Sequence, residues 1–309
     1  MVIENLTEDS QKTAVSGLDL ATWRGWAKTE SIAANISPQE VDWFLQEVAE
    51  LDRLSLKLES FRERSQIFLK FPLSHLNQLW QHRLKDRVPI QYLVGVTPWR
   101  NFSLKVARGV LIPRPETELI IDLAVQAVQK SSVPNLNLGH WVDLGTGSGA
   151  ISFGLSMMFP EAKIHSVDYS KVALAIAKEN AENLGLSSKI QFYEGSWWTP
   201  LEKLKGQISG LVSNPPYIPT GILSQLQPEV KYHEPYLALD GGKDGLEAIR
   251  YLVDRSPNYL QSGGIWLVEM MAGQGESVAK LLEDSSDYRS IKILSDLAGI
   301  QRFALAYRT

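Results

Sequence analysis

Four consecutive residues in the middle of the chain have the types and order needed to bind a planar amino group. Asn214, Pro215, Pro216 and Tyr217 follow an apolar run that predicts a strand. One proline ends a strand because it has no N–H for the ladder, whereas two in a row also fix φ at both positions and force the preceding residue out of the helical region. The carbonyls of Asn214 and Pro215 then point in set directions, and the Asn214 side-chain oxygen adds an acceptor beneath an aromatic ring.

A second stretch, "VDLGTGSGA", passes from a predicted strand into a glycine-rich turn. Gly145, Gly147 and Gly149 let the chain turn tightly and let a ligand approach the backbone at a helix N-terminus. Asp168 ends the next predicted strand, where a carboxylate can accept both hydroxyls of a ribose. A plain strand-to-helix turn and a solvated aspartate are the alternatives. The pattern alone fits both a dinucleotide and S-adenosylmethionine.

The nitrogen of an amide or aromatic amine suits the pair of acceptors at Asn214. Its lone pair is delocalised into the attached π system, so it is a poor nucleophile. Two acceptors that engage both N–H bonds favour a charge-enriched, more pyramidal nitrogen, and Tyr217 can fix its angle to an incoming methyl. Positioning and preorganised dipoles then supply most of the catalysis. No base is needed before attack, because the protonated product is acidic and loses its proton afterwards.

Residues 1–90 predict a small N-terminal helical bundle, since apolar residues recur there at helical spacing. Ser37, Pro38 and Glu40 predict an N-cap, a first-turn proline and a capping-box glutamate for the second helix. The apolar runs are Leu18, Leu20, Trp23 and Trp26; Val41, Phe44, Leu45, Val48 and Leu51; and Leu76, Leu79, Trp80 and Leu84.

Residues 91–113 predict a β-hairpin linker. Side chains alternate from Phe102 to Val106, Gly109 turns the chain, and Val110 to Ile112 run back. From residue 114 to 309, strands and helices alternate, and a final hairpin covers "SIKILSDLAGIQRFALAYR". Such alternation indicates an α/β fold with a mostly parallel sheet and helices on both faces.

Composition narrows the function further. The 309 residues are 44% hydrophobic, carry a net charge of -4 and include no cysteine. Thiolate chemistry is therefore excluded, five scattered histidines suggest no metal site, and the acidic balance disfavours stable nucleic-acid binding. No apolar run reaches the roughly 18 residues of a membrane span, and the polar start "MVIENLTEDSQKT" is unlike a leader. We therefore expect a cytoplasmic protein.

The glycine loop, Asp168 and "NPPY" together resemble the class I S-adenosylmethionine-dependent methyltransferases, with a Rossmann-like fold, that act on planar nitrogens. Within that group the whole chain resembles the PrmC/HemK family of release factor glutamine methyltransferases. The resemblance includes the N-terminal bundle and the motifs "PIQYLVG", "LIPRPETE", "DLGTGSGAI", "NPPYIP", "HEPYLALDGGKDGL" and "DLAGIQR".

The resemblance implies a role for each motif residue. Asp168 would hold the cofactor ribose, and Trp197 would pack beside its adenine. The substrate glutamine amide would be held by Asn214, Pro215, Pro216 and Tyr217, and Asn214 would also border the cofactor. The residues along the methionine part of S-adenosylmethionine would be Gly145, Thr146, Gly147, Ser148 and Gly149.

The implied activity is methyl transfer to the glutamine amide of the Gly-Gly-Gln motif in peptide-chain release factors, with the N-terminal bundle helping to recognise this partner. Glutamine methylation of a ribosomal protein is an alternative. Adenine methylation in DNA is disfavoured by the acidic balance, and a non-catalytic cofactor-binding module by the complete "NPPY". In "RPETE", Arg114 can help to close the site, or Glu116 and Glu118 can favour the start of the following helix.

Overall fold

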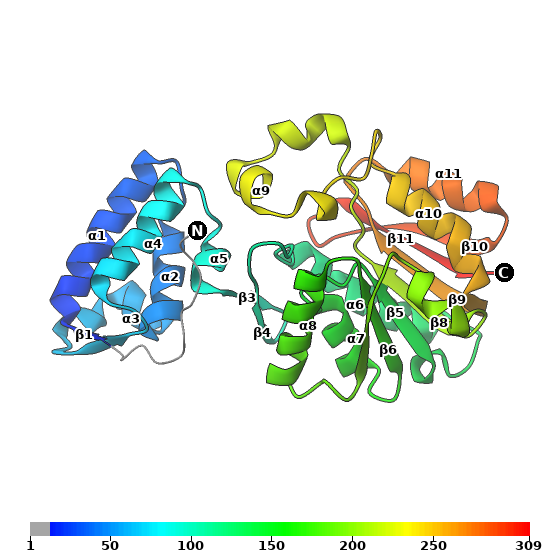
Figure 1. Cartoon of the computed structure of the whole chain (residues 1–309), viewed down its shortest axis with the longest axis horizontal. Helices are drawn as coiled ribbons and strands as arrows, with labels where there is room; N and C mark the ends of the chain where they lie inside the picture. Colours follow the sequence, from blue (N-terminus) through cyan, green and yellow to red (C-terminus); the bar gives the residue numbers. More distant parts are fainter. Residues whose placement is uncertain (1–12) are drawn as a thin grey trace. The chain divides into compact units, whose positions relative to one another are not determined.

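The computed structural model describes residues 13–309, and it forms two compact units that divide between Gly95 and Val96 (Figure 1). Residues 1–12, which hold most of the polar N-terminal stretch, lie outside the described residues. In the described part of the chain, no helix combines the length and apolar character needed to cross a membrane.

The first unit contains the predicted helices, packed around aromatic side chains. The ring of Trp80 lies 5.5 Å from that of Phe44 and 6.2 Å from that of Trp23. A short antiparallel pair of strands, which the sequence did not predict, joins Thr13–Val15 to Ile67–Leu69. The elements are β1 (Thr13–Val15), α1 (Gly17–Ala33), α2 (Gln39–Ala49), α3 (Arg53–Leu58), η1 (Ser60–Glu63), β2 (Ile67–Leu69), α4 (Leu73–Lys85) and α5 (Ile90–Val94).

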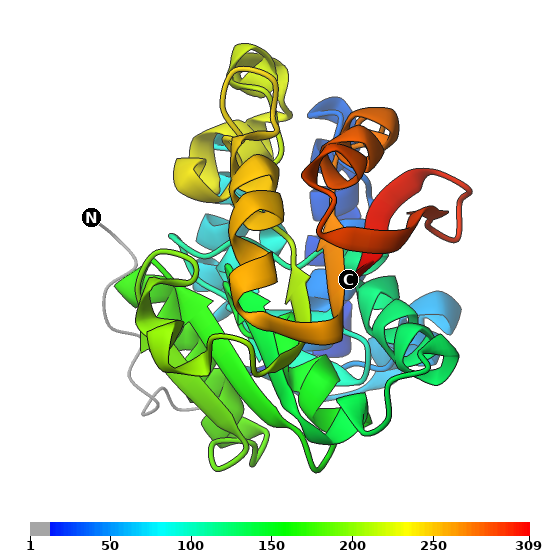
Figure 2. The same cartoon turned by 90° about the vertical axis from the view of Figure 1, so that its right-hand side faces the viewer.

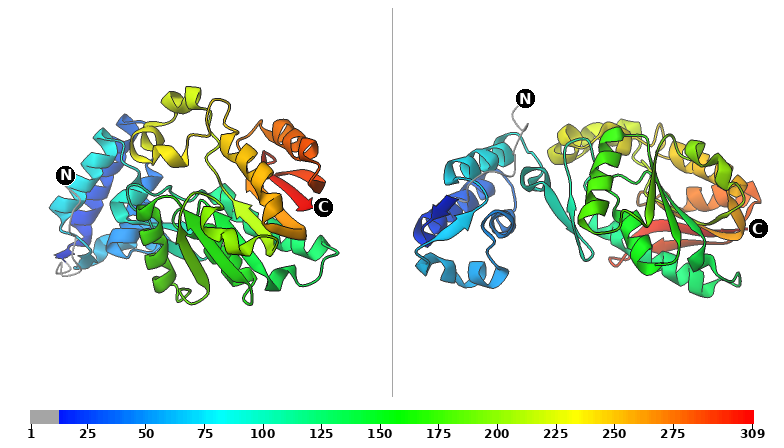
Figure 3. Two further views of the ribbon diagram at one scale, coloured as in Figure 1. Left: turned by 45° about the vertical axis from the view of Figure 1, so that its right-hand side comes forward. Right: turned by 60° about the horizontal axis from the view of Figure 1, so that its bottom comes forward.

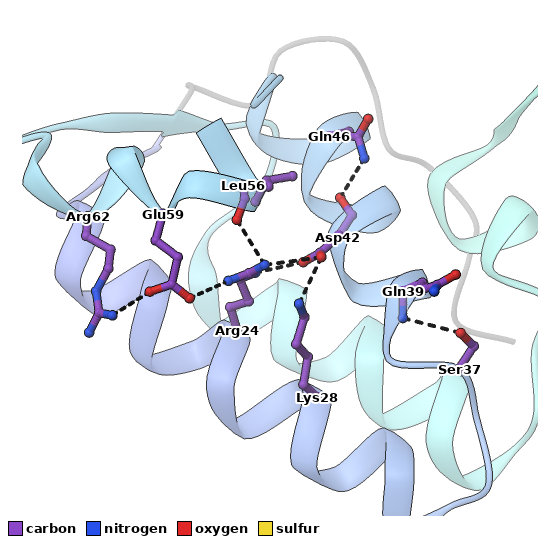
Figure 4. A network of polar contacts seen from close by, with 9 residues as sticks. All are labelled: Arg24, Lys28, Ser37, Gln39, Asp42, Gln46, Leu56, Glu59 and Arg62. Carbon is purple, nitrogen blue, oxygen red and sulfur yellow. Dashed lines mark hydrogen bonds and ion pairs between the residues drawn. The ribbon is translucent and has the colours of Figure 1, made fainter. Parts of the chain in front are cut away.

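A buried guanidinium ties three of these helices together (Figure 4). Arg24 of α1 is 8% exposed and donates to both carboxylate oxygens of Asp42 in α2, at 2.7 and 3.1 Å. It also donates to the Leu56 carbonyl of α3 and to Glu59. Burial alone would raise the pKa of Asp42, but the hydrogen bonds from Arg24 and Lys28 outweigh it and lower that pKa.

The capping-box prediction for α2 was wrong at Glu40. The N-cap residue is Pro38, which makes no side-chain cap bond, and the Ser37 hydroxyl before it accepts from the Gln39 N–H at 3.3 Å. The Glu40 carboxylate instead accepts two hydrogen bonds from Arg83 of α4, at 2.7 and 3.0 Å. A bidentate ion pair with a neighbouring helix replaces the local cap.

The predicted hairpin exists, but its turn and second strand were wrong. Strand β3 (Val96–Trp99) pairs with β4 (Phe102–Lys105), and the turn contains Arg100 at φ +49°. Gly109 turns the chain at φ +91° as expected, yet the residues after it form no strand. Val110 packs instead against helix α8 (Lys171–Asn183). The apolar residues after Gly109 are therefore buried in a hydrophobic core and do not pair as a strand.

The second unit is the expected α/β fold. Its seven-stranded sheet has the order β10-β11-β9-β8-β5-β6-β7, parallel except where β11 meets its neighbours β9 and β10. Figures 2 and 3 show the twisted sheet between helices. Its strands are β5 (His140–Leu144), β6 (Lys163–Asp168), β7 (Ile190–Glu194), β8 (Ile208–Ser213), β9 (Leu260–Glu269), β10 (Tyr288–Ser295) and β11 (Gln301–Arg308). Its helices are η2 (Pro115–Glu118), α6 (Leu119–Lys130), η3 (Leu136–Leu138), α7 (Ala150–Met158), α8 (Lys171–Asn183), η4 (Thr199–Leu204), η5 (Thr220–Gln225), α9 (Pro228–His233), η6 (Tyr236–Ala238), α10 (Glu247–Arg255), η7 (Ser256–Asn258) and α11 (Gly275–Ser285).

The strands carry apolar side chains on both faces of the sheet, as expected when helices cover both faces. In β9, Ile265 and Leu267 pack into the core shared with α6 and α7, whereas Trp266 and Val268 pack into the core shared with α10 and α11. The two cores clamp the sheet and leave the carboxyl ends of its parallel strands for the site.

Candidate active site

The strand order places the two predicted motifs side by side. The chain leaves β5 for β6 on one side, and β8 pairs with β5 on the other, so the sheet has a switch point between β5 and β8. Open α/β sheets bind ligands at such a point, beyond the carboxyl ends of the strands. The Ser213 hydroxyl donates to the Leu144 carbonyl at 2.5 Å, which holds these two strand ends together.

The glycine loop has the backbone conformation that only glycine adopts easily. Gly145, Gly147 and Gly149 have φ of +80°, +55° and +93°. The N–H groups of Gly145 and Thr146 donate to the Val167 carbonyl at 2.9 and 3.0 Å. A Cβ added at Gly147 would meet nothing within 4 Å, so the backbone there is open to a ligand.

Asp168 contacts this loop directly. Its Oδ2 accepts from the Gly147 N–H at 2.8 Å, and its Oδ1 accepts from the Ser170 N–H at 2.8 Å. Burial raises the pKa of the Asp168 carboxyl, while the Ser170 and Gly147 N–H groups act to lower it. Each oxygen keeps a further lone pair for a ligand hydroxyl.

Trp197 and Asn214 both lie close to Gly145. A Cβ built on Gly145 would be 3.9 Å from the Asn214 carbonyl oxygen and 3.9 Å from the Trp197 ring. Trp197 has φ +50°, an uncommon conformation for a large residue that is more frequent at functional sites. The structure thus brings together three residues that are far apart in the sequence.

The "NPPY" segment is held by the side chains of three other residues of the second unit. Asn214 Nδ2 donates to the Thr117 hydroxyl at 3.2 Å, and the Tyr217 hydroxyl donates to Glu269 at 3.2 Å. Gln274 Nε2 donates to the Tyr217 carbonyl at 3.0 Å. Pro215, between the two held residues, is buried. Among the described residues, the Nδ2 bond to Thr117 is the only hydrogen bond of the Asn214 side chain, so its Oδ1 is available to a ligand.

Sequence reasoning missed Asp143, a fully buried carboxyl in β5. Its Oδ2 accepts from the hydroxyls of Thr146 and Ser152 at 2.6 and 2.8 Å and from the Ser152 N–H at 3.1 Å. Its Oδ1 has no partner among the described residues. Burial raises the pKa of Asp143 to about 6. Its signal was a charged residue inside an otherwise apolar strand, immediately before the glycine loop.

Sequence reasoning also missed Glu269, which ends β9 and is fully buried. Burial raises its pKa to about 7, against the hydrogen bonds of Thr117 and Tyr217, which lower it. Its Oε2 has no hydrogen-bond partner in the described part of the chain. The signal was the acidic end of "GIWLVE", which parallels Asp168 at the end of "SVD".

The "RPETE" segment makes contacts beyond those expected from the sequence. Arg114 donates to Glu234 at 2.7 Å, a pair that joins this segment to the region after α9 within the second unit. Glu118 accepts from the Arg100 N–H at 2.8 Å. No side-chain cap bond is made at the start of η2 or α6. Glu116 and Glu118 do lie at the start of η2, and Glu118 at the N-cap of α6, as the charge-based interpretation expects, but the motif also links loops of this unit.

The segment "RPETE" also borders a cleft of about 680 Å³. The cleft contains none of the predicted site residues, but its Glu116 raises the pKa of Glu269 through its charge, and Arg302 lowers it. The cleft is lined by Arg100, Asn101, Pro115, Glu116, Glu118, Leu119, Asp122, Asp296, Leu297, Ala298, Ile300 and Arg302.

Comparison with known proteins decides the family. Residues 137–219, which include the glycine loop and "NPPY", match a family model described as a methyltransferase domain. A release factor glutamine methyltransferase from Synechocystis sp. is 52% identical over 295 residues, which cover 96% of this chain and 98% of the relative. The chain belongs to the release factor glutamine methyltransferase family. A family member from Caulobacter vibrioides is 34% identical over 284 residues, covering 90% of this chain and 94% of that protein.

Solved structures agree on the fold. The hMettl16 catalytic domain in complex with MAT2A 3'UTR hairpin 6 has a TM-score of 0.52 and 14% identity, covering 79% of this chain and 84% of that one. The likeness extends to the fold alone, and it confirms the class I methyltransferase architecture expected from the sequence.

The residues present fit the S-adenosylmethionine that the family resemblance implies. The open backbone at Gly147 admits a ligand, and the carboxylate of Asp168 has lone pairs for ribose hydroxyls. The partly buried Trp197 beside Gly145 offers an aromatic face. The unpaired Oδ1 of Asp143 shows that this end of β5 holds an acceptor that the chain itself leaves unused.

We predict that Asp168→Ala weakens S-adenosylmethionine binding by about 10- to 100-fold, the cost of losing hydrogen bonds to a charged group. Asp168→Asn, which keeps one acceptor for the Gly147 N–H, should lose less. Calorimetry measures both dissociation constants, and circular dichroism controls for the fold. Unchanged affinity in the alanine variant would move the ribose site elsewhere.

A second prediction concerns pH. The pKa of Glu269, about 7, lies above its ordinary value of 4.5, so the folded state binds the proton more tightly than the unfolded state does. The contribution of Glu269 to the free energy of unfolding is fully present below pH 4.5 and is lost as pH rises through 7.

Glu269→Gln removes this titration. Its melting temperature, measured relative to that of wild type by calorimetry, should therefore be higher at pH 8 than at pH 5. An equal difference at both pH values would show that Glu269 does not titrate in this range.

Proposed function

We propose that this enzyme transfers a methyl group from S-adenosylmethionine to the side-chain amide nitrogen of the glutamine in the Gly-Gly-Gln motif of peptide-chain release factors. The observation that carries the proposal is the Asn214 amide. Its Nδ2 donates to the Thr117 hydroxyl, which leaves Oδ1 as the free acceptor, and the Asn214 backbone carbonyl oxygen lies 3.9 Å from a Cβ built on Gly145 of the glycine loop. When bound, S-adenosylmethionine supplies an electrophilic methyl group.

The residues of "NPPY" would act on the glutamine amide as acceptors and as a wall. Asn214 Oδ1 and a backbone carbonyl of Asn214 or Pro215 accept from the two N–H bonds, which concentrates charge on the nitrogen. The ring of Tyr217 sets the tilt of the amide. The chain thus contributes orientation and fixed dipoles instead of proton abstraction, and the proton leaves after transfer.

Release factors are the favoured substrate because the relatives that match nearly the whole chain bear the name release factor glutamine methyltransferase. "RPETE" at 114–118 also favours this branch over the ribosomal-protein branch. We further propose that the bundle, which the first unit contains, helps to recognise the protein partner, and that the enzyme works in the cytoplasm without stable binding to nucleic acid.

The substrate prediction is that a full-length release factor accepts one methyl group on its Gly-Gly-Gln glutamine, located by mass spectrometry after incubation with labelled S-adenosylmethionine. A short Gly-Gly-Gln peptide should have a much lower kcat/KM, because it lacks the surfaces that the bundle would recognise.

The control is a release factor with Gln→Ala in this motif, which should accept no label. Ribosomal proteins and DNA are included in the same incubation. Label in either of them, with an unlabelled release factor, would contradict the proposed substrate.

The catalytic prediction is that Asn214→Ala lowers the single-turnover rate by on the order of 100- to 1,000-fold, the typical effect of removing one preorganised electrostatic partner. The melting temperature should change little. The assay uses saturating S-adenosylmethionine, because Asn214 also borders the cofactor site.

Asn183→Ala, at the exposed end of α8, is the matched control and should keep the wild-type rate. A near wild-type rate for Asn214→Ala would refute the role of this amide and leave the two prolines as a strand-ending turn.

A further inference from the structure

The Asn214 side chain must face one particular way to do its work. A primary amide has an oxygen that accepts and an NH₂ group that donates. The substrate amide presents its NH₂ group, which only donates hydrogen bonds, to the site. If the Asn214 amide were rotated by 180°, its own NH₂ group would face the substrate NH₂ group and no hydrogen bond could form. The observed rotamer avoids this, because Nδ2 donates to the Thr117 hydroxyl at 3.2 Å. Thr117 therefore selects which end of the amide is left for the substrate.

Thr117 is itself held in place. It lies in η2, is only 3% exposed, and donates its backbone N–H to the Arg114 carbonyl at 3.2 Å. A hydroxyl that accepts a hydrogen bond has its own hydrogen to donate. The Thr117 side chain acts, with that of Tyr217, to lower the pKa of the Glu269 carboxyl, so we infer that the Thr117 hydrogen points toward Glu269.

Glu269 holds the other end of "NPPY" as well. Its Oε1 accepts from the Tyr217 hydroxyl at 3.2 Å. Its Oε2 is fully buried and has no hydrogen-bond partner among the described residues, so the carboxyl retains capacity to accept the Thr117 hydrogen. One buried carboxyl thus lies between the partner of Asn214 and the hydroxyl of Tyr217.

Stability does not explain this arrangement. A buried carboxyl is costly, and its replacement by an apolar side chain of similar volume is often neutral or stabilising. A phenylalanine in place of Tyr217 and an apolar residue in place of Glu269 would fill the same space. A role in orienting the Asn214 and Tyr217 side chains, which would flank the substrate amide, explains why polar groups are present at Thr117 and Glu269.

We propose that Thr117 and Glu269 are positioning residues for methyl transfer, with Thr117 setting the direction of the Asn214 amide and Glu269 setting both the Thr117 hydroxyl and the Tyr217 ring. This inference rests on the proposed function for its substrate. Neither residue touches the reacting atoms. Their role is to hold the acceptor and the ring that do.

The test compares four full-length variants with wild type. Thr117→Val keeps the shape but removes the hydroxyl, and Thr117→Ser restores it. Glu269→Gln puts an NH₂ donor where one of two hydroxyls needs an acceptor. Thr97→Val is the matched control, since Thr97 lies in β3 and is 4% exposed. The measurements are the single-turnover rate at saturating S-adenosylmethionine, the cofactor dissociation constant and the melting temperature.

We expect Thr117→Val and Glu269→Gln to lose about 10- to 100-fold in rate, the scale of a small misplacement of a reacting group. Their cofactor affinity and melting temperature at pH 7 should stay near wild type. Thr117→Ser should recover most of the rate, and Thr97→Val should match wild type. Rates near wild type for Thr117→Val and Glu269→Gln, or losses that only follow the folded fraction, would overturn the proposal.

A readout independent of activity separates this inference from the proposed function. In protein labelled with ¹⁵N-asparagine, the Asn214 NH₂ signals are assigned by their absence in Asn214→Ala. They should shift in Thr117→Val and hold their wild-type position in Thr97→Val. Unchanged signals in Thr117→Val would refute the positioning role. A wild-type enzyme that leaves release factor unlabelled would refute only the proposed substrate.

Discussion

The place of β8 between β5 and β9 is the constraint on which the site depends. Parallel strands end at the same edge of a sheet, so the residues that follow these three strands become neighbours. Gly145 follows β5, Asn214 follows β8 and Glu269 is the last residue of β9, with Ser213 opposite Val268 in the ladder. No local preference of the loops could bring these residues together. The paired strands and the two apolar cores that clamp them do so.

Hydrogen bonds from buried side chains then fix the loops that the sheet only brings close. Asp143 binds Thr146 and Ser152 and so shapes the start of α7. Gln274 bonds the Tyr217 carbonyl, and its Oε1 accepts from the Met271 N–H at 2.9 Å. The segment "EMMAGQGE" at 269–276 thereby supports "NPPY". Each of these groups loses hydration on burial, and the hydrogen bonds that offset this loss also fix its orientation.

The sequence predicted most of the fold, because periodicity and glycine placement report burial directly. Helical spacing identified α1, α2 and α4, and alternation of strands and helices identified the sheet. Hydrogen-bond partners that are distant in the chain could not be predicted from the sequence. Glu40 has a suitable local cap to make but pairs with Arg83. Asn214 was found from its neighbours in sequence, whereas Thr117 lies 97 residues away from it and Glu269 lies 52 residues from Tyr217. Such contacts follow from strand order. Their only sign in the sequence is a charged residue within or at the end of an apolar strand.

The account centres on a preorganised pair of acceptors that hold the glutamine amide. A crystal structure of the enzyme with S-adenosylhomocysteine and a Gly-Gly-Gln peptide tests it most directly. The account predicts that the amide nitrogen lies within about 3 Å of Asn214 Oδ1 and of a backbone carbonyl of Asn214 or Pro215, with Asn214 Nδ2 still on Thr117. A glutamine amide bound away from Asn214, or an Asn214 rotated to face it with its NH₂ group, would contradict the account.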